Sequence, residues 1–338
     1  MKMEKVRFAF LGVAHIHSNS YARAIIELPE AELKAVYEEN EKLGREFSER
    51  FGINYYDDYE RLLKMEDVDA VVITSETVKH HRLAMRAIEE GKHILCEKPI
   101  AMTLREADEM INSADKAGLK FQTCFVMRYH TTSRLVKNLI DEGRIGRVLA
   151  IVGTNKLNAS LPLSMDWFLK PELSGGGAIM DHTVHLADLI RWYTGSEAIE
   201  VYTESGKNVT KNIGVEDNFL TTLEMENGVI GHIDGSWSYA RGFYTWGDVT
   251  LEVLGSEGVI LLDAFRQNIY YVGMEAPNDK LIWHYYGCDA DKEMIKSFIN
   301  CIVKDETPVA SGFDGRQGLA ITLASYESLK VGKPVRPG

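Results

Sequence analysis

Three side chains that can move a proton stand in two short stretches far apart in the sequence. Lys98 follows a predicted strand in "GKHILCEKPIA" and precedes a proline. Asp181 and His185 are four residues apart in "SGGGAIMDHTVHLADLIRW", so they share one face of a predicted helix. A histidine is suited to accept the proton of a hydroxyl group near neutral pH, and a lysine beside the same oxygen stabilises its negative charge. Together the three residues indicate hydride chemistry at an alcohol, although each alone is as typical of a turn, a helix core or a helix start.

The stretch "FAFLGVAHIHSN" supports two interpretations. His15 and His17 could be metal ligands, or the stretch could be the strand, turn and helix start of a dinucleotide-binding domain. In the second case Gly12 permits the tight bend, Ala14 lies where backbone N–H groups approach a pyrophosphate, and His17 replaces the glycine that allows close helix packing.

An acidic residue is expected about twenty residues further on, at the end of the second strand, and Glu38 stands there. Its carboxylate can accept hydrogen bonds from a ribose diol. Glu39 beside it would repel a 2′-phosphate, and no arginine is adjacent in the sequence. The pair therefore favours NAD over NADP, unless it simply begins a solvated helix.

The metal interpretation needs further ligands, which Asp181, His182 and His185 could supply. A metal-dependent hydrolase barrel would also require eight parallel strands, and the second half of the chain is patterned differently. We therefore predict no metal.

Strands alternate with helices of 10 to 15 residues up to about residue 123, which predicts βαβ units and a parallel sheet. Later strands are separated mostly by turns such as 226–228, which predicts an antiparallel sheet interrupted by helices. The predicted fold class is α/β, with a doubly wound parallel sheet in residues 1–123 and a second α/β domain in residues 124–338. A final helix over 313–330 is expected to pack near the first domain.

Composition excludes several classes of protein. The 338 residues have a formal net charge of -12 and no basic stripe, so we expect no nucleic acid partner. The four cysteines are far apart and fit reduced thiols. No segment has the apolar length of a signal peptide or a membrane span, which predicts a cytoplasmic protein without membrane contact.

The E-K-P and G-G-G-x-x-x-D-x-x-x-H patterns occur in order, together with "DAVVITSETVKHH", "GRIGRV" and "SYESLKVGKPV". With these motifs the chain resembles, over nearly its whole length, the glucose-fructose oxidoreductase, inositol dehydrogenase and rhizopine-catabolism (Gfo/Idh/MocA) family. The resemblance implies an N-terminal Rossmann domain, a C-terminal domain with a large, mostly antiparallel sheet, and a nicotinamide between them.

The resemblance also implies roles for individual residues. The catalytic set is Lys98, Asp181 and His185, and the residue that takes the proton first stays open. The expected cofactor-binding residues are Gly12, Ala14, His15, Ile16, Glu38, Thr74, His80, Glu97 and Lys98. Apart from the resemblance, the places of Arg128, Tyr129, Lys156 and Trp167 in the chain suggest contact with substrate in the pocket wall. His182 is either a substrate contact or a packing residue. Two departures from the family pattern, Glu76-Thr77 in place of Pro-Asn and Thr183 in place of glycine, leave the ribose contacts and the substrate geometry open.

The sequence thus predicts an NAD-dependent dehydrogenase that acts on a secondary alcohol of a sugar, cyclitol or related polyol. A redox-neutral elimination that uses bound NAD and a non-catalytic NAD-binding regulator of the same fold are the alternatives. By analogy with the family we expect a homodimer or homotetramer.

Overall fold

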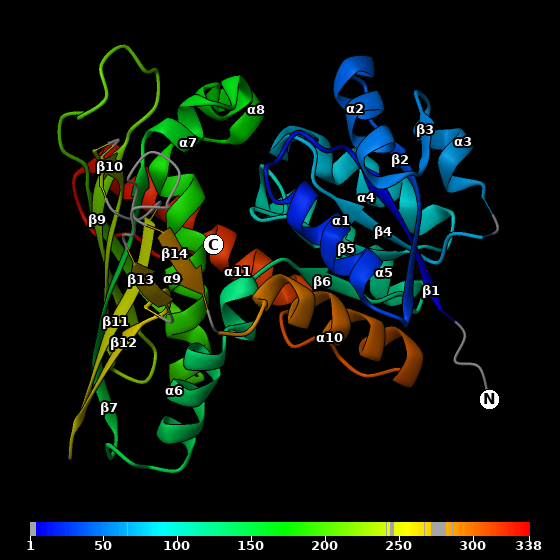
Figure 1. Ribbon diagram of the computed structural model, residues 1–338. Coiled ribbons are helices and arrows are strands. Elements are labelled where there is room, and N and C mark those ends of the chain that lie inside the picture. The colour runs from blue at the N-terminus through cyan, green and yellow to red at the C-terminus, as the bar shows by residue number, and fades with distance from the viewer. Residues whose placement is uncertain are drawn as a thin grey trace.

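Two six-stranded sheets, one from the first part of the chain and one from the later part, stand side by side (Figure 1). The structure is a computed structural model. It describes residues 5–65, 67–240, 242–243, 247–266, 268–271, 282–285 and 287–338.

The first sheet is parallel, with strand order β3-β2-β1-β4-β5-β6. Its central strands are short hydrophobic runs buried on both faces, as expected when helices cover both sides. Because the order reverses between β1 and β4, a crevice opens at the carboxyl ends of these two strands. The strands are β1 (Val6–Leu11), β2 (Ala31–Tyr37), β3 (Asn54–Tyr56), β4 (Ala70–Ile73), β5 (His93–Cys96) and β6 (Phe121–Thr123).

Local signals set the ends of the helices around this sheet. Asn40 caps one helix, which ends at Gly52 in the left-handed conformation. Thr103 and Glu106 form the capping box that the sequence predicts. The elements are α1 (Ser18–Glu27), α2 (Glu41–Phe51), α3 (Tyr59–Leu63), η1 (Thr77–Lys79), α4 (His80–Glu89), α5 (Leu104–Lys116) and η2 (Val126–Tyr129).

The second sheet is mixed and mostly antiparallel, with strand order β12-β11-β7-β10-β9-β8. Only β7 and β10 pair in parallel within it. The strands are β7 (Val148–Asn158), β8 (Ala198–Glu204), β9 (Asn218–Met225), β10 (Ile230–Tyr239), β11 (Gly247–Gly255) and β12 (Val259–Asp263), and β13 (Asn268–Tyr271) pairs separately with β14 (Ile282–Tyr285).

Helices lie between the two sheets, whereas no described helix covers the far face of the second sheet (Figure 1). The long helix α9 packs on β7 and β10, α10 packs against α1, and α11 contacts α9 and β8 on one side and α5 and β6 on the other. These later helical elements are α6 (Thr131–Asp141), α7 (Ser160–Leu163), η3 (Asp166–Leu169), α8 (Pro171–Ser174), α9 (Ala178–Thr194), α10 (Ala290–Lys304) and α11 (Gly312–Val331).

Three strands of the two sheets were not expected from the sequence. They are β3, which has only three residues, and the edge strands β8 and β12, of which β8 has an irregular pattern of buried and exposed positions. Helix α10 returns to the first sheet although it lies late in the sequence. Among the described helices, none has the length and apolar character needed to cross a membrane.

Candidate active site

The loop after β1 begins with a glycine that no other residue could replace easily. Gly12 has φ +81°, and a Cβ atom there would lie 2.4 Å from Cβ of Ser75. Its N–H donates to the carbonyl of Tyr37, and Thr74 Oγ1 donates to its carbonyl at 2.6 Å. The turn is therefore fixed to the carboxyl ends of β2 and β4, at the crevice of the first sheet.

Glu38 supports the same loop from the end of β2. Its carboxylate is buried and accepts hydrogen bonds from the N–H groups of Val13 at 2.8 Å and Asn40 at 3.0 Å. A ribose diol could still use the remaining lone pairs, so the position suits a dinucleotide.

No arginine is adjacent to Glu39 in the sequence, but the fold brings one to it. Arg82 Nη2 and Lys79 Nζ each lie 2.8 Å from the Glu39 carboxylate. The hydrogen bond from Lys79, together with that from Arg82, lowers the pKa of Glu39 to about 2, although burial opposes the change. Arg82 and Lys79 thus lie next to the expected position of the cofactor ribose, and both are paired with Glu39.

Glu97 and three aromatic side chains form a buried polar network beneath this loop. Tyr21 donates to Glu97 Oε2 at 2.8 Å, and His17 Nδ1 lies 3.3 Å from Oε1. Burial lowers the pKa of His17, but the charge of Glu97 and their hydrogen bond raise it by more. Burial lowers the pKa of His15 to about 3, so this ring is neutral at physiological pH.

Among the described residues, His15, His17 and Glu97 form a group close enough to hold a metal ion. Their existing contacts argue against this use. Nδ1 of His15 accepts from the N–H of His17, whereas a metal-bound imidazole normally donates through its second nitrogen. Both oxygens of Glu97 already have partners in Tyr21 and His17. The geometry thus fits a hydrogen-bonded network better than a metal centre.

His80 ties the loop after β4 to the E-K-P turn. Nδ1 lies 2.9 Å from the carbonyl oxygen of Pro99, and Nε2 lies 3.1 Å from that of Ser75. Burial lowers the pKa of His80. A neutral ring donates to only one of the two carbonyl groups at a time.

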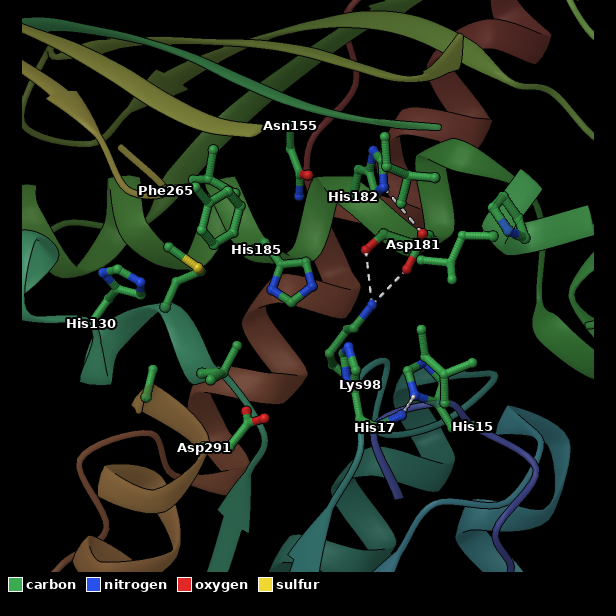
Figure 2. A pocket seen from close by; sticks show the side chains of 18 of the residues that line it. His15, His17, Lys98, His130, Asn155, Asp181, His182, His185, Phe265 and Asp291 are labelled. Atoms are coloured by element: carbon green, nitrogen blue, oxygen red, sulfur yellow. Dashed lines mark hydrogen bonds and ion pairs between the residues drawn. The ribbon is translucent and has the colours of Figure 1, made fainter. Parts of the chain in front are cut away.

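Lys98 and Asp181 meet across the boundary between the two sheets. Nζ of Lys98 lies 2.6 Å from Oδ1 of Asp181 (Figure 2). Nε1 of Trp237 donates to Oδ2 at 3.1 Å. Burial opposes ionisation of Asp181, but the charge of Lys98 holds its pKa well below the usual value. This ion pair places the ammonium group of Lys98 at the wall of the main cavity, which lies between the two sheets.

His185 lies one turn further along α9 and lines the same cavity. Burial, followed by the charge of Lys98, lowers the pKa of His185 well below its ordinary value. Its Nδ1 has no hydrogen-bond partner among the described residues. A neutral imidazole beside an ammonium group can accept a proton, so this pair has the form of a general base and an electrostatic stabiliser.

His182 is also buried in the cavity wall. Its Nε2 lies 3.1 Å from Asp181 Oδ2 but lacks hydrogen-bond alignment, and neither ring nitrogen has a hydrogen-bond partner among the described residues. Asn155 enters the cavity from β7, a residue that the sequence analysis did not single out. Alternation along β7 is the signal that could have found it, since Ile151, Gly153 and Leu157 share its buried face.

The cavity has a volume of about 810 Å³ and lies between the two sheets. Its walls include the loop residues His15 and Ile16 on one side and Asn155 and His182 on the other. Side chains from both halves of the chain therefore converge on one space, as an enzyme with a cofactor and a substrate requires.

Four residues expected to contact substrate lie elsewhere. Lys156 projects from the opposite face of β7 and pairs with Asp234 at the far side of the sheet. Trp167 donates through Nε1 to the carbonyl of Ala14 and lines a small second pocket with Lys98 and Asp181, but it does not line the main cavity. Tyr129 is fully buried outside the cavity wall.

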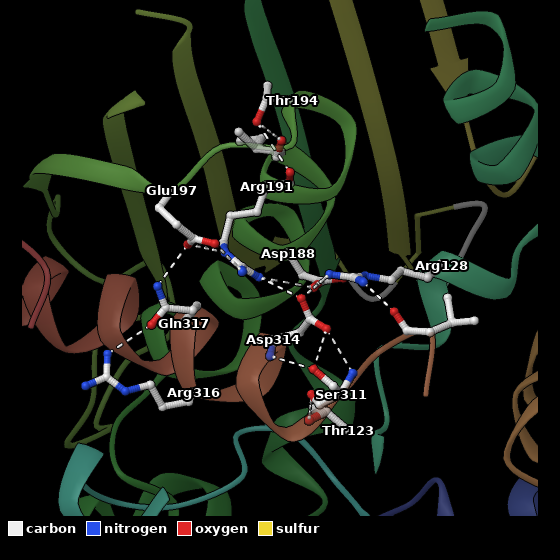
Figure 3. A network of polar contacts seen from close by, with 12 residues as sticks. Thr123, Arg128, Asp188, Arg191, Thr194, Glu197, Ser311, Asp314, Arg316 and Gln317 are labelled. Carbon is white, nitrogen blue, oxygen red and sulfur yellow. Dashed lines mark hydrogen bonds and ion pairs between the residues drawn. The ribbon is translucent and has the colours of Figure 1, made fainter. Parts of the chain in front are cut away.

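Arg128, the fourth, is the centre of a separate ionic network (Figure 3). Its Nε and Nη2 atoms lie 2.8 Å and 2.6 Å from the two oxygens of Asp188, and Nη2 lies 2.9 Å from Asp314. Arg191 joins the network through Asp314 and Glu197. These contacts tie η2, α9 and α11 together and leave Arg128 outside the cavity.

Models of one oxidoreductase family match both halves of the chain. The family model described as an oxidoreductase family with an NAD-binding Rossmann fold (GFO_IDH_MocA) matches residues 6–125, and that of the GFO/IDH/MocA C-terminal domain matches residues 133–261. The chain belongs to the Gfo/Idh/MocA oxidoreductase family.

Relatives and solved structures of this oxidoreductase family cover the whole chain. Myo-inositol 2-dehydrogenase of Thermotoga maritima is 28% identical over 98% of both chains, and scyllo-inositol 2-dehydrogenase of Bacillus subtilis is 25% identical over 98% of this chain and 96% of its own. The crystal structure of a probable dehydrogenase from Thermotoga maritima has a TM-score of 0.84 at 28% identity and covers 98% of each chain. The expected two-part α/β fold and the family are thus confirmed.

Proposed function

We propose that this protein is an NAD-dependent dehydrogenase that oxidises a secondary alcohol of a sugar, cyclitol or related polyol. The observation that carries the proposal is the neutral His185, whose Nδ1 has no hydrogen-bond partner among the described residues, beside the buried Lys98–Asp181 pair. Residues 1–123 would hold the cofactor and Lys98, and residues 124–338 would supply Asp181 and His185.

Bound NAD would supply the acceptor for the hydride that leaves the alcohol carbon. His185 takes the hydroxyl proton as the carbonyl group forms, because its imidazole is neutral and adjoins the cavity. Lys98 donates a hydrogen bond to the same oxygen and stabilises its developing negative charge. Asp181 holds the ammonium group in place, and His182 and Asn155 bind neighbouring hydroxyl groups of the substrate.

The crevice of the first sheet suits a dinucleotide. Gly12 permits the tight turn, and the loop faces the cavity. The Glu38 carboxylate lies where it would accept hydrogen bonds from a ribose diol. We propose NAD over NADP because Glu38 opposes a 2′-phosphate, while Glu39 pairs with the nearby cations Lys79 and Arg82. The full proposed cofactor set is Gly12, Ala14, His15, Ile16, Glu38, Thr74, His80, Glu97 and Lys98.

A screen of polyols, sugars and sugar acids with NAD and with NADP, read by NADH absorbance, tests the proposal. We expect turnover with NAD, and we expect Lys98→Ala to lose it while NAD still binds. Because this variant leaves Asp181 without its cation, its folding is checked by circular dichroism, and Lys137→Ala on α6 serves as the control. Full activity of Lys98→Ala would refute the assignment.

The same screen separates the alternatives. A redox-neutral elimination would release product without net NADH, and a regulator would bind NAD tightly without turning over any compound.

We also propose that the protein forms a homo-oligomer through the far face of the second sheet. Val152, Leu220, Ile230 and Leu254 are exposed apolar side chains on that face, and no described helix covers it. Light scattering should therefore give a mass of two or four chains. A monomer at micromolar concentration would contradict this proposal and leave the catalytic one intact.

A further inference from the structure

Three polar side chains from the second half of the chain gather at one corner of the cavity. Figure 2 shows Asn155, His182 and His185 directed toward the same region, next to the Lys98–Asp181 pair. His182 is 2% exposed; its Nε2 lies 3.1 Å from Oδ2 of Asp181, and its Nδ1 has no hydrogen-bond partner among the described residues. A buried polar group without a partner is rare, so this corner is built to bind hydroxyl groups of a ligand.

The neighbouring wall has a different chemistry. It is formed by aliphatic and aromatic side chains from η2, β7, α7, η3 and β11 and from the segment before η3. They are Met127, Leu157, Pro162, Met165, Phe168 and Val249. All six are buried, and most belong to the hydrophobic core of the second half of the chain.

A polyol that carries a hydroxyl group on every carbon fits this combination poorly. Hydroxyl groups near Asn155 and His182 would find partners, whereas those directed at Leu157, Phe168 or Val249 would be buried without any. An apolar substituent at the same wall would instead be stabilised by its removal from water. The volume of about 810 Å³ lies within the range of roughly 300–1,000 Å³ found for pockets that take drug-sized ligands.

Charge restricts the substituent further. Asp291 lines the cavity at the start of α10, and Lys98 is already paired with Asp181. An anionic group such as a phosphate or a carboxylate would therefore meet a negative charge and no unpaired lysine or arginine among the described residues of the cavity wall.

Building on the proposed dehydrogenase function, we propose that the substrate is a neutral glycoside. Its sugar ring presents a secondary hydroxyl group to His185 and Lys98 and a second one to His182 or Asn155. Its aryl or alkyl aglycone packs against the wall formed by Leu157, Phe168 and Val249. Oxidation leaves the glycosidic bond intact, with the hydride on NAD and the hydroxyl proton on His185.

The test compares matched pairs of glycosides. Methyl and phenyl glycosides of glucose, galactose, mannose and xylose, in both anomeric forms, are assayed with NAD next to myo-inositol. We expect kcat/KM for the best phenyl glycoside to exceed that of its methyl partner by about 10-fold or more, since buried apolar groups of this size discriminate at that level. Val249→Thr, which keeps the shape of the side chain, should reduce the ratio about 5-fold, whereas the exposed control Val303→Thr on α10 should not change it.

Each result of these assays either supports or overturns the glycoside proposal. Equal kcat/KM for phenyl and methyl glycosides, or myo-inositol as the best substrate, would overturn it and leave the dehydrogenase function standing. If no compound is oxidised, the dehydrogenase proposal fails separately, and binding to the NADH-loaded protein, measured by calorimetry, replaces turnover. In that case tighter binding of phenyl glycosides, weakened by Val249→Thr, supports the apolar subsite, and equal binding overturns it.

Discussion

Helix α9 carries two buried clusters of charged side chains, and they differ in what they leave open. Around Asp181, the cluster faces a cavity. Nε2 of His182 contacts Asp181 (Figure 2), whereas the Nδ1 atoms of His182 and His185 have no hydrogen-bond partner among the described residues. Around Asp188, both carboxylate oxygens accept from Arg128, and Arg191 is shared between Asp314 and Glu197 (Figure 3).

The difference separates a reactive site from a structural one on the same helix. In the Asp188 cluster, charge is paired with charge at optimal distances, so its groups are not available to a ligand. In the Asp181 cluster, the unpaired nitrogens would be costly unless a substrate or water supplied partners. Burial and charge alone do not distinguish the two, since Lys98 and Arg128 are almost equally buried.

The largest expected effect is on the reactive cluster. His185→Asn removes the proton acceptor and should lower kcat by about 10²- to 10⁴-fold, the range typical of general acid–base residues. Thermal unfolding should change little, because Nδ1 of His185 forms no hydrogen bond with the described residues. Steady-state kinetics and calorimetry measure both quantities, and His232→Asn on the second sheet is the matched control. Retention of kcat would remove His185 from the mechanism.

The next prediction concerns the structural cluster. Arg128→Met leaves the buried Asp188 without both of its hydrogen bonds and with only Arg191, 4.0 Å away, and should lower the free energy of unfolding by about 3–5 kcal/mol. Lys98→Met should cost less stability, because the Asp181 side chain is 10% exposed and borders the cavity, whereas Asp188 is 1% exposed. Urea denaturation of the two variants compares them directly. A greater loss of stability in Lys98→Met than in Arg128→Met would contradict the distinction between the Asp181 and Asp188 clusters.

A third prediction uses the partnered histidines near Glu97 as a contrast to His185. The pKa of His15 falls from 6.5 to about 3 on folding, so between these values the unfolded chain binds a proton that the folded chain does not. Stability from this group is thus lost as the pH falls below 6.5. His15→Gln should make the acid side of the stability curve shallower by as much as about 1.4 kcal/mol per pH unit.

His17 provides the opposite control for that experiment. Its pKa is raised in the folded state, so its stabilising pairing is present at low pH and is lost as the pH rises through the folded pKa. His17→Gln should therefore lose stability chiefly on the acid side. Urea titrations from pH 4 to pH 8 measure both variants, and changes of the same sign in the two would contradict the assignments.

The smallest effect is expected at the exposed charges beside the ribose position. Glu39→Gln frees Arg82 from its partner and leaves Lys79 paired with Glu76 alone, and should tighten NADP binding about 5-fold, which is the scale of an exposed ion pair. NAD binding should change by less than about 2-fold, because Glu38 is untouched. Fluorescence titration with both cofactors is the measurement, with Glu32→Gln as control. Unchanged NADP affinity would show that Glu39 does not hold these cations away from the cofactor.

Much of the fold was predictable because its signals are local. The alternation of strands and helices up to Thr123 and the capping box at Thr103 depend on neighbouring residues, and the structure has both. The short strand β3 was not predictable, since three residues carry no periodicity. The parallel pairing of β7 with β10 depends on contacts between segments far apart in the sequence.

The sequence by itself determined that Lys98, Asp181 and His185 are candidates for one site, because their motifs occur in a fixed order and helical spacing aligns the last two. Only the tertiary structure decided which neighbours join them. Asn155 enters the cavity and Lys156 leaves it because successive side chains of a strand point to opposite faces. Arg128 pairs with Asp188, sixty residues away in sequence, because η2 and α9 pack together. Spacing along the chain specifies a helix face, whereas pairing between distant elements specifies which charges are satisfied and which remain for a substrate.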